Sequence, residues 1–570
     1  AALNETGVKL DSNAGPVSMT HSVVWDPHAV AIEALSGSIS ISNSVLGVLD
    51  SGAVIYRAAT TNIGGNFNNL YAVDEAMIGV QTASSNLAEY ISGWTHLTGE
   101  EGQSLDVYPH FANPSAYDFH LKTQTVGGRY DPFLGFVSDP LTSTLIDSGD
   151  PASMAYTNEP SPNGSRINIG LYGGTLEASK GVTAPWLLAA SLRSGGSVSG
   201  TSSLHWVAAN FTNGARVSVE YSRDGGDLWQ AIATSVLASA ETVVWDSTVV
   251  SNSPAGLWRV TSLDVGGPAD ATTNFFSIRN SPLEIFVNDA STSGDVYTTS
   301  AGAPTNWSAS ASHPLSSLEL ALSKLNLDAG DRLYVDSGTY TNTSGIVLGL
   351  KDSGNPGEGQ VHILGSTNCT TATVLLRNNT VSSNAYVMAL TRASYVGLSN
   401  LVLQGAGNAL LVTNSAQIEM ERMTIRSSAD TGAWVVNSTN VQIRRTALYG
   451  HAKTGLRVSR SRQVNLLHSV VVSNGNYAVL IADNTLPVGM TNSILSAHGG
   501  QAYLLKLDSP ANLVSDYNNL YRDNSASLGI IDGLQRQSLL SWQDASSNDL
   551  HSLTHDPEFA DAGAGDFHPK

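Results

Sequence analysis

Apolar residues recur at a nearly constant spacing between residues 360 and 521. One apolar position in each repeat is filled by Val396, Ile418, Val441, Val464 and Val488. The intervals are 22, 23, 23 and 24 residues, and the residue two positions further on is also apolar every time. One repeat is too short to bury its apolar face alone. We therefore predict coils that stack about 4.8 Å apart around a continuous core.

The strands of these repeats, such as "SYVGLSNLVL", "AQIEMERMTI" and "NVQIRRTAL", resemble the coils of the right-handed parallel β-helix proteins of the pectin-lyase-like superfamily. The resemblance and the general chirality of parallel crossover connections imply the right-handed form.

Two further segments resemble the covers over the open ends of such coils in secreted bacterial β-helix proteins. Residues 313–340 have leucines every three to four residues and then a "GDRLYVDSGTY" string, which predicts an amino-terminal cap with a helix at about 315–326. Residues 145–174 resemble the carboxy-terminal closing segment. Covers are needed because bare coils expose apolar core and unpaired strand edges.

The closing segment carries charged residues of both signs, namely Asp147, Asp150, Glu159 and Arg166. These residues form either structural ion pairs or a calcium site. Their spacing fits no compact calcium loop, which favours the ion pairs. We therefore predict no cofactor, with a structural calcium ion as the alternative.

The apolar pattern changes to alternation between residues 182 and 282. About seven short runs of this kind occur, including "RVSVEYS" and "LWRVTSL", with "SRDGGD" as a hairpin signal. The aromatic residues available for a core are Trp206, Tyr221, Trp229, Trp245 and Trp258. We predict an immunoglobulin- or fibronectin-type β-sandwich without the usual cysteine pair, since Cys369 is the only cysteine.

The end of the chain repeats a segment from its first quarter. "DPEFADAGAGDFHPK" (556–570) matches "YPHFANPSAYDFHLK" (108–122) at 8 of 15 positions. Earlier residues of the first 122 also match residues that lie 447 to 450 positions later in the chain, as Trp94 matches Trp542. Self-similarity over this length indicates a tandem array of large units.

We therefore predict three regions in an all-β chain, with right-handed parallel β-helix segments flanking an immunoglobulin-like β-sandwich. Residues 1–180 form the C-terminal part and closing segment of one β-helix, and residues 182–282 form the sandwich. Residues 284–570 form the cap and coils of a second β-helix, truncated before its closing segment. The next residues of the parent protein should then resemble "TQTVGGRYDPF" (123–133).

The charge balance narrows the range of partners. The net charge is −20, which argues against binding to nucleic acid or an anionic membrane surface because phosphate would be repelled. No apolar run approaches the roughly 20 residues of a membrane-spanning helix. The start, "AALNETGVKL", does not resemble a signal peptide, so any targeting segment would lie outside this chain or have been removed.

Basic residues are scarce, but several cluster on the coils. Arg422, Arg445 and His468 occupy one position of three successive coils, 23 residues apart. We predict that they form a positive stripe that binds an anionic polysaccharide, because Arg can hold carboxylates and sulfates bidentately. Lys453 and Arg457 are further candidates for this site. The alternative is a row of turns whose side chains point into solvent or are neutralised by neighbouring glutamates.

No complete catalytic motif of the pectin-lyase-like enzymes is present. Their hydrolases combine clustered aspartates with Gly-His-Gly and Arg-x-Lys patterns, whereas the nearest strings here are "AHGGQ" and "IRR". A lyase would need a base beside a group that neutralises the substrate carboxylate, and His451, Lys453 and Arg457 supply only the base. We interpret His120 as part of a strand and turn. No catalytic, metal or cofactor-binding residue is predicted, and the enzyme question stays open.

Large units repeated head to tail favour an extracellular structural or adhesive protein, such as a bacterial surface fibre, sheath or filament. Its partners would be neighbouring copies of the repeat and an anionic polysaccharide. The alternative is a modular polysaccharide lyase or glycoside hydrolase with the sandwich as an accessory domain. That protein would have one catalytic unit and unlike neighbours.

Overall fold

The computed structural model describes residues 5–11, 15–81, 86–368, 370–382, 384–483, 486–497, 502–523 and 526–570. Cys369 lies outside these residues. The chain divides into two compact units, Ala1–Ser281 and Pro282–Lys570, called here the first and the second unit. Within the described ranges, no helix is long and apolar enough to cross a membrane.

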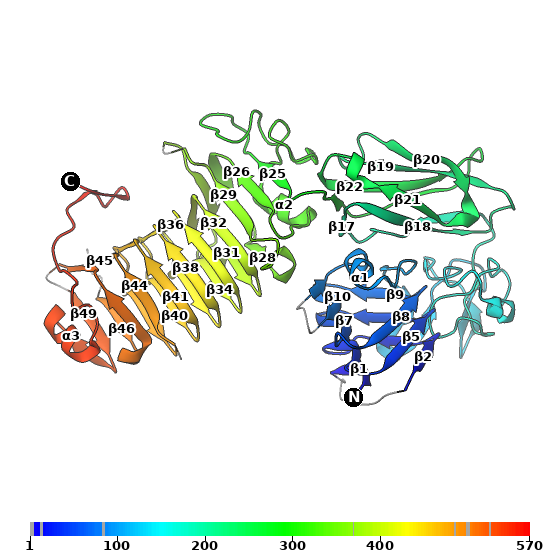
Figure 1. Cartoon of the computed structure of the whole chain (residues 1–570), viewed down its shortest axis with the longest axis horizontal. Coiled ribbons are helices and arrows are strands. Elements are labelled where there is room, and N and C mark those ends of the chain that lie inside the picture. The colour runs from blue at the N-terminus through cyan, green and yellow to red at the C-terminus, as the bar shows by residue number, and fades with distance from the viewer. Residues whose placement is uncertain are drawn as a thin grey trace. The chain divides into compact units, whose positions relative to one another are not determined.

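The second unit is a right-handed parallel β-helix whose coils contribute one strand to each of three sheets (Figure 1). The first sheet runs from β25 (Glu284–Val287) to β47 (Leu513–Asp516), the second from β27 (Gly338–Thr341) to β48 (Asn519–Arg522), and the third from β28 (Ile346–Leu348) to β50 (Leu534–Arg536). The central strands of the first sheet are β32 (Ser394–Ser399), β35 (Ala416–Glu421), β38 (Thr439–Arg444), β41 (Arg462–Leu467) and β44 (Val488–Thr491). One complete coil is β35 with β36 (Thr424–Arg426) and β37 (Thr431–Val436).

The predicted apolar ladder is confirmed in this first sheet. Val396 pairs with Ile418, Ile418 with Val441, and Val441 with Val464, each on the next coil. All four side chains are fully buried. The coils therefore stack in register, and parallel main-chain hydrogen bonds run along the axis of the helix.

The predicted cap helix is α2 (Leu318–Lys324), which is shorter than the range 315–326. It begins late because Ser317 caps it and accepts a hydrogen bond from Leu320 N at 3.1 Å. Leu315 instead forms a parallel bridge with Val287, and its side chain is fully buried.

The first unit also contains coils of three sheets (Figure 1), whose strands pair in parallel except for the last one. One sheet is β1 (Thr6–Leu10), β4 (Val30–Ala34), β7 (Ser51–Arg57), β10 (Glu75–Gln81) and the antiparallel β11 (Asn86–Ala88). The others are β2 (Val17–Thr20), β5 (Ser38–Ser42) and β8 (Asn62–Asn66), and β3 (Val23–Trp25), β6 (Val45–Val48) and β9 (Asn69–Ala72). Their inward side chains form one buried cluster.

Two helices were not expected from the sequence. They are α1 (Ile91–Thr98) in the first unit and α3 (Leu539–Ser546) in the second. Each has only eight residues, too few for a clear helical period, and tertiary packing of one tryptophan secures each of them. Trp94 of α1 and Trp542 of α3 are fully buried.

The segment that follows α1 consists mostly of turns. Its short strands are β12 (Phe111–Asn113), β13 (Asp118–Leu121), β14 (Arg129–Asp131) and β15 (Gly135–Val137). They pair as two antiparallel hairpins, β12 with β13 and β14 with β15. A 3-10 turn follows at Met154–Asn158.

The remainder of the first unit forms two small sheets around one core. The strands of one are β16 (Trp186–Ala189), β18 (Thr201–Ala209) and β21 (Thr242–Asp246), and those of the other are β17 (Ser197–Val198), β24 (Phe276–Ile278), β22 (Ser253–Ser262), β19 (Arg216–Ser222), β20 (Gln230–Leu237) and β23 (Ala269–Ala271). Four of the five expected aromatic residues lie in the core. Trp229 instead stacks with Arg259, whose guanidinium carbon lies 4.2 Å from the centre of the Trp229 ring. The immunoglobulin-type assignment stays a prediction.

Candidate functional site

The three residues of the predicted stripe share one turn of the second unit. Arg422, Arg445 and His468 directly follow β35, β38 and β41, where the chain passes from the first sheet to the second. Each has a left-handed main-chain conformation, with φ of 55°, 49° and 49°. Their main-chain N–H groups donate to carbonyls of the next coil at 3.1, 3.1 and 3.2 Å. One side chain per coil therefore stands at the same corner.

Glu421 balances part of the charge of this corner. Arg445 Nη1 donates to Glu421 Oε1, and Arg422 Nε lies 3.9 Å from the same oxygen. The side chains of Arg422 and Arg445 remain 61% and 60% exposed. Because exposed ion pairs contribute only about 0 to 1 kcal/mol, an anionic ligand can compete with Glu421 for both guanidinium groups.

Lys453 and Arg457 lie away from this corner. Lys453 Nζ donates to Asp430 Oδ2 at 2.6 Å. Arg457 belongs to β40 (Thr454–Ser459) of the third sheet, where its guanidinium carbon lies 4.4 Å from the centre of the Trp434 ring. The five predicted residues are thus distributed over two faces of the coils, and only the corner residues form a row.

His451 is a satisfied core residue. Its Nδ1 lies 2.7 Å from Ser428 Oγ and its Nε2 lies 3.1 Å from the carbonyl oxygen of Ile425. Burial lowers the pKa of this imidazole to about 4, because the charged form would lose its hydration. His451 is therefore neutral at physiological pH and closed to a polymeric substrate.

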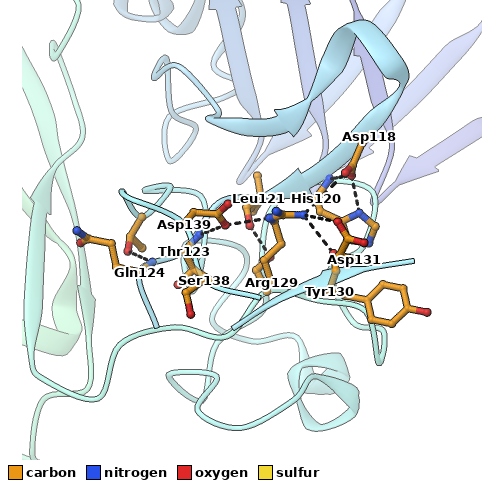
Figure 2. A network of polar contacts seen from close by, with 12 residues as sticks. Asp118, His120, Leu121, Thr123, Gln124, Arg129, Tyr130, Asp131, Ser138 and Asp139 are labelled. Atoms are coloured by element: carbon orange, nitrogen blue, oxygen red, sulfur yellow. Dashed lines mark hydrogen bonds and ion pairs between the residues drawn. The ribbon is translucent and has the colours of Figure 1, made fainter. Parts of the chain in front are cut away.

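A polar cluster that the sequence did not indicate ties the hairpins after α1 together. Figure 2 shows Arg129 of β14 among three aspartates. Its Nε lies 2.9 Å from Asp139 Oδ2, and its Nη1 lies 3.9 Å from Asp118 and from Asp131. The side chain of Arg129 is only 12% exposed. The aspartates are up to 21 residues apart in sequence, so no local spacing could have revealed the cluster.

His120 joins the same cluster from β13. Its Nδ1 lies 2.6 Å from Asp118 Oδ1, and its ring stacks on Tyr172 at 3.6 Å between ring centres (Figure 2 shows the contact with Asp118). The side chain is 2% exposed. The expected position in a strand and turn is confirmed, and a substrate cannot reach this imidazole.

The four charged residues of segment 145–174 separate into three environments. Arg166 Nη1 donates to Glu241 Oε1 rather than to any of the three acidic residues of its own segment. The carboxylate of Asp150 accepts from Ala152 N at 2.8 Å. Asp147 and Glu159 are buried, and burial raises their pKa values to about 8 and about 7.

A conventional metal or acid-base centre is not evident in the part of the chain that the structure describes. No group of three or more His, Cys, Asp or Glu residues there could hold a metal ion. The outer face of the first sheet carries amides instead, with Gln442 Nε2 donating to Asn440 Oδ1 at 2.9 Å and Asn465 Nδ2 donating to Gln442 Oε1 at 3.2 Å. Such an amide row can hydrogen-bond to hydroxyl groups but supplies no base.

Comparison with protein families agrees with this architecture. Residues 359–521 match the family model described as a right handed beta helix region. The observed coils and this match identify the fold of the second unit as a right-handed parallel β-helix.

No curated protein sequence matches the chain. Among solved structures, an alginate lyase from Paenibacillus sp. str. FPU-7 is 17% identical, with 37% of this chain and 76% of the lyase covered and a TM-score of 0.32. The pectate lyase Pel9A is 14% identical, with 50% and 84% covered and a TM-score of 0.34. Likenesses at these TM-scores carry no information about activity.

Proposed function

We propose that this chain belongs to an extracellular structural or adhesive protein of tandem units, such as a surface fibre, sheath or filament. The observation that carries the proposal is that the two sequence copies also share their packing. Trp94 and Trp542 are buried in equivalent helices. Each indole ring packs against a glycine, Gly79 in the first unit and Gly529 in the second, and these two glycines are 450 residues apart. A Cβ atom added at Gly79 would lie 2.0 Å from Trp94, and one added at Gly529 would lie 2.5 Å from Trp542.

The equivalence extends to the chain after each helix. Asn69 forms a parallel bridge with Leu105, and Asn519 forms the same bridge with Leu553. The two copies therefore close their coils in the same way. A repeated unit of this kind suits a long, stiff protein, because stacked coils are hydrogen-bonded along their axis and resist bending.

The positive corner suggests the material that such a fibre would contact. Arg422, Arg445 and His468 supply one basic side chain per coil, and a polyuronate carries one carboxylate per sugar ring. Planar guanidinium groups bind carboxylates and sulfates in a bidentate manner. The proposed ligand is therefore an acidic polysaccharide of the cell surface or of a host matrix.

Electron microscopy of the native particle on cells, combined with assays on pectin, alginate and sulfated algal glycans, tests the proposal. We expect long filaments or arrays and no depolymerisation. A compact, unassembled protein that releases unsaturated or reducing sugar ends would contradict the structural role and favour a lyase or hydrolase.

A further inference from the structure

Two buried acidic residues of the first unit have carboxylate oxygens without a hydrogen-bond donor among the described residues. Asp147 is fully buried and Glu159 is 6% exposed. Among the described residues, neither oxygen of Asp147 has a hydrogen-bond partner, and Glu159 Oε2 has none either. Carboxylate oxygens that leave water without a donor or a cation are costly, so three of them in one segment require a physical explanation.

Hydrogen bonds from the surrounding loops hold the carboxylate of Glu159 and the main chain of Asp147 in place. Glu159 Oε1 accepts from Asn168 N at 3.0 Å and from Gly174 N at 2.7 Å, which leaves Oε2 as its free oxygen. The main-chain N–H of Asp147 donates to Asn168 Oδ1 at 2.8 Å. Asn168 therefore connects the two acidic residues and fixes their separation.

Two glycines bring the main chain close to the carboxylate of Asp147. A Cβ added at Gly164 would lie 2.5 Å from Asp147 Oδ2, and one at Gly181 would lie 1.9 Å from it. These two positions admit no side chain beside Oδ2, so main-chain atoms, water or a bound ion are left to satisfy this oxygen there.

The charge of the pocket is also unbalanced. Arg166 is the nearby cation, and its side chain already donates to Glu241, to Gly149 O and to Ser148 O. Asp147, Glu159 and Glu241 carry three negative charges against the one positive charge of Arg166 when all are ionised, which leaves a deficit of two. His205, whose Nδ1 lies 2.6 Å from the main-chain oxygen of Glu241, is neutral because burial lowers its pKa to about 4.

We propose that Asp147 and Glu159 bind a calcium ion. A divalent cation matches the charge deficit, and hard carboxylate oxygens without His or Cys favour Ca²⁺ over zinc. No third Asp, Glu, His or Cys joins the pair within the described residues, so main-chain carbonyls and water would complete the coordination. The ion would join the loops around residues 147, 159 and 168 and so lock the segment that closes the coils.

Calorimetric titration of the full chain with Ca²⁺, with thermal unfolding in Ca²⁺ and in EDTA, tests this site. We expect the transition of the first unit to rise by roughly 5 to 10 °C in excess Ca²⁺, which binds only the folded state. Asp147→Asn and Glu159→Gln should each remove this rise and one binding event. Asp150→Asn, an acidic neighbour outside the pocket, is the matched control and should retain both.

If either pocket variant fails to fold, the other still reports on the site, and circular dichroism distinguishes misfolding from lost binding. The proposal is overturned if the wild-type transition is the same in Ca²⁺ and EDTA. It is equally overturned if folded Asp147→Asn and Glu159→Gln proteins bind Ca²⁺ with the wild-type stoichiometry and affinity.

Discussion

The buried site beside Trp94 and its counterpart beside Trp542 have the same framework but different side chains. In the first unit, Glu101 accepts from Asn68 Nδ2 at 3.0 and 3.1 Å. In the second unit, Asp549 accepts from Asn518 Nδ2 at 3.1 Å and also from Trp542 Nε1 at 3.0 Å.

A compensating exchange accompanies the longer carboxylate. Gly65 stands where the second copy has Ser515, and a Cβ added at Gly65 would lie 1.8 Å from Glu101 Oε1. Ser515 instead donates to Asp549 Oδ1 at 2.8 Å. Glutamate with glycine thus fills the space that aspartate with serine fills in the other copy. The repeat preserves the volume of the site rather than its residues.

The exchange leaves a polar defect in the first copy only. Trp94 Nε1 is buried and has no hydrogen-bond partner among the described residues, whereas Trp542 Nε1 donates to Asp549 Oδ2. Burial also raises the pKa of Glu101 to about 7, although hydrogen bonds from Ser104 and Asn68 oppose that rise. We therefore expect the two copies to respond differently to pH and to substitution.

The largest expected difference concerns pH. The pKa of Glu101 rises from 4.5 to about 7 on folding, so the folded state binds more protons between these values. Its contribution to the free energy of unfolding is present below pH 4.5 and is lost as the pH rises through about 7, on the order of 3 kcal/mol. Native-state hydrogen exchange of the first unit measures this slope.

Glu101→Gln should flatten the slope, and Asp549→Asn in the second unit is the matched control that should leave the slope of the first unit unchanged. An unaltered slope in Glu101→Gln would show that Glu101 does not titrate in this range.

The next effect concerns the compensating pair. Gly65→Ser should destabilise the first unit by about 1 to 3 kcal/mol, because the new Cβ collides with Glu101. The double variant Gly65→Ser with Glu101→Asp reproduces the pair found in the second copy and should recover most of the loss. Native-state hydrogen exchange measures the unfolding free energy of both variants and so gives the coupling energy between positions 65 and 101. Simple additivity of the two substitutions would refute the compensation.

A smaller effect separates the two indoles. Trp542→Phe removes the donor to Asp549 Oδ2, whereas Trp94→Phe removes an N–H group that no described residue accepts from. We expect the first substitution to destabilise its unit by about 1 to 2 kcal/mol more than the second destabilises its own. Equal losses in denaturant unfolding of the two variants would show that the Asp549 contact contributes nothing.

The smallest effect tests the corner stripe. The corresponding turn of the first unit has His21, Asn43 and Phe67 with φ of 46°, 49° and 54°, and His21 takes the position that His468 has in the second unit. Arg445→Glu should weaken binding to polygalacturonate or alginate about fivefold, and the affinity should fall steeply with salt because exposed charges are screened. Arg216→Glu in the first unit makes the same charge change and should have no effect. Equal binding by both variants, measured by affinity electrophoresis, would remove the stripe as a glycan site.

The sequence by itself determined the stacked coils, the position of the cap helix and the shared corner of Arg422, Arg445 and His468. These features follow from a period in one dimension, because residues one coil apart must become neighbours once the coils stack in register. Spacing along the chain also identified the long repeat, since equivalent residues occur at equivalent positions of both copies.

Only the tertiary structure decided which polar groups meet. Arg166 pairs with Glu241, 75 residues away, and Arg129 lies among aspartates from three segments. Asp147 has no donor to its carboxylate in the part of the chain that the structure describes. Helices α1 and α3 likewise depend on a tryptophan that packs against a glycine of the preceding strand, Gly79 of β10 and Gly529 of β49 (Ser527–Ile531). None of these contacts repeats with the coil period, because irregular loops outside the coils bring the residues together and each contact depends on three-dimensional packing rather than on spacing along the chain.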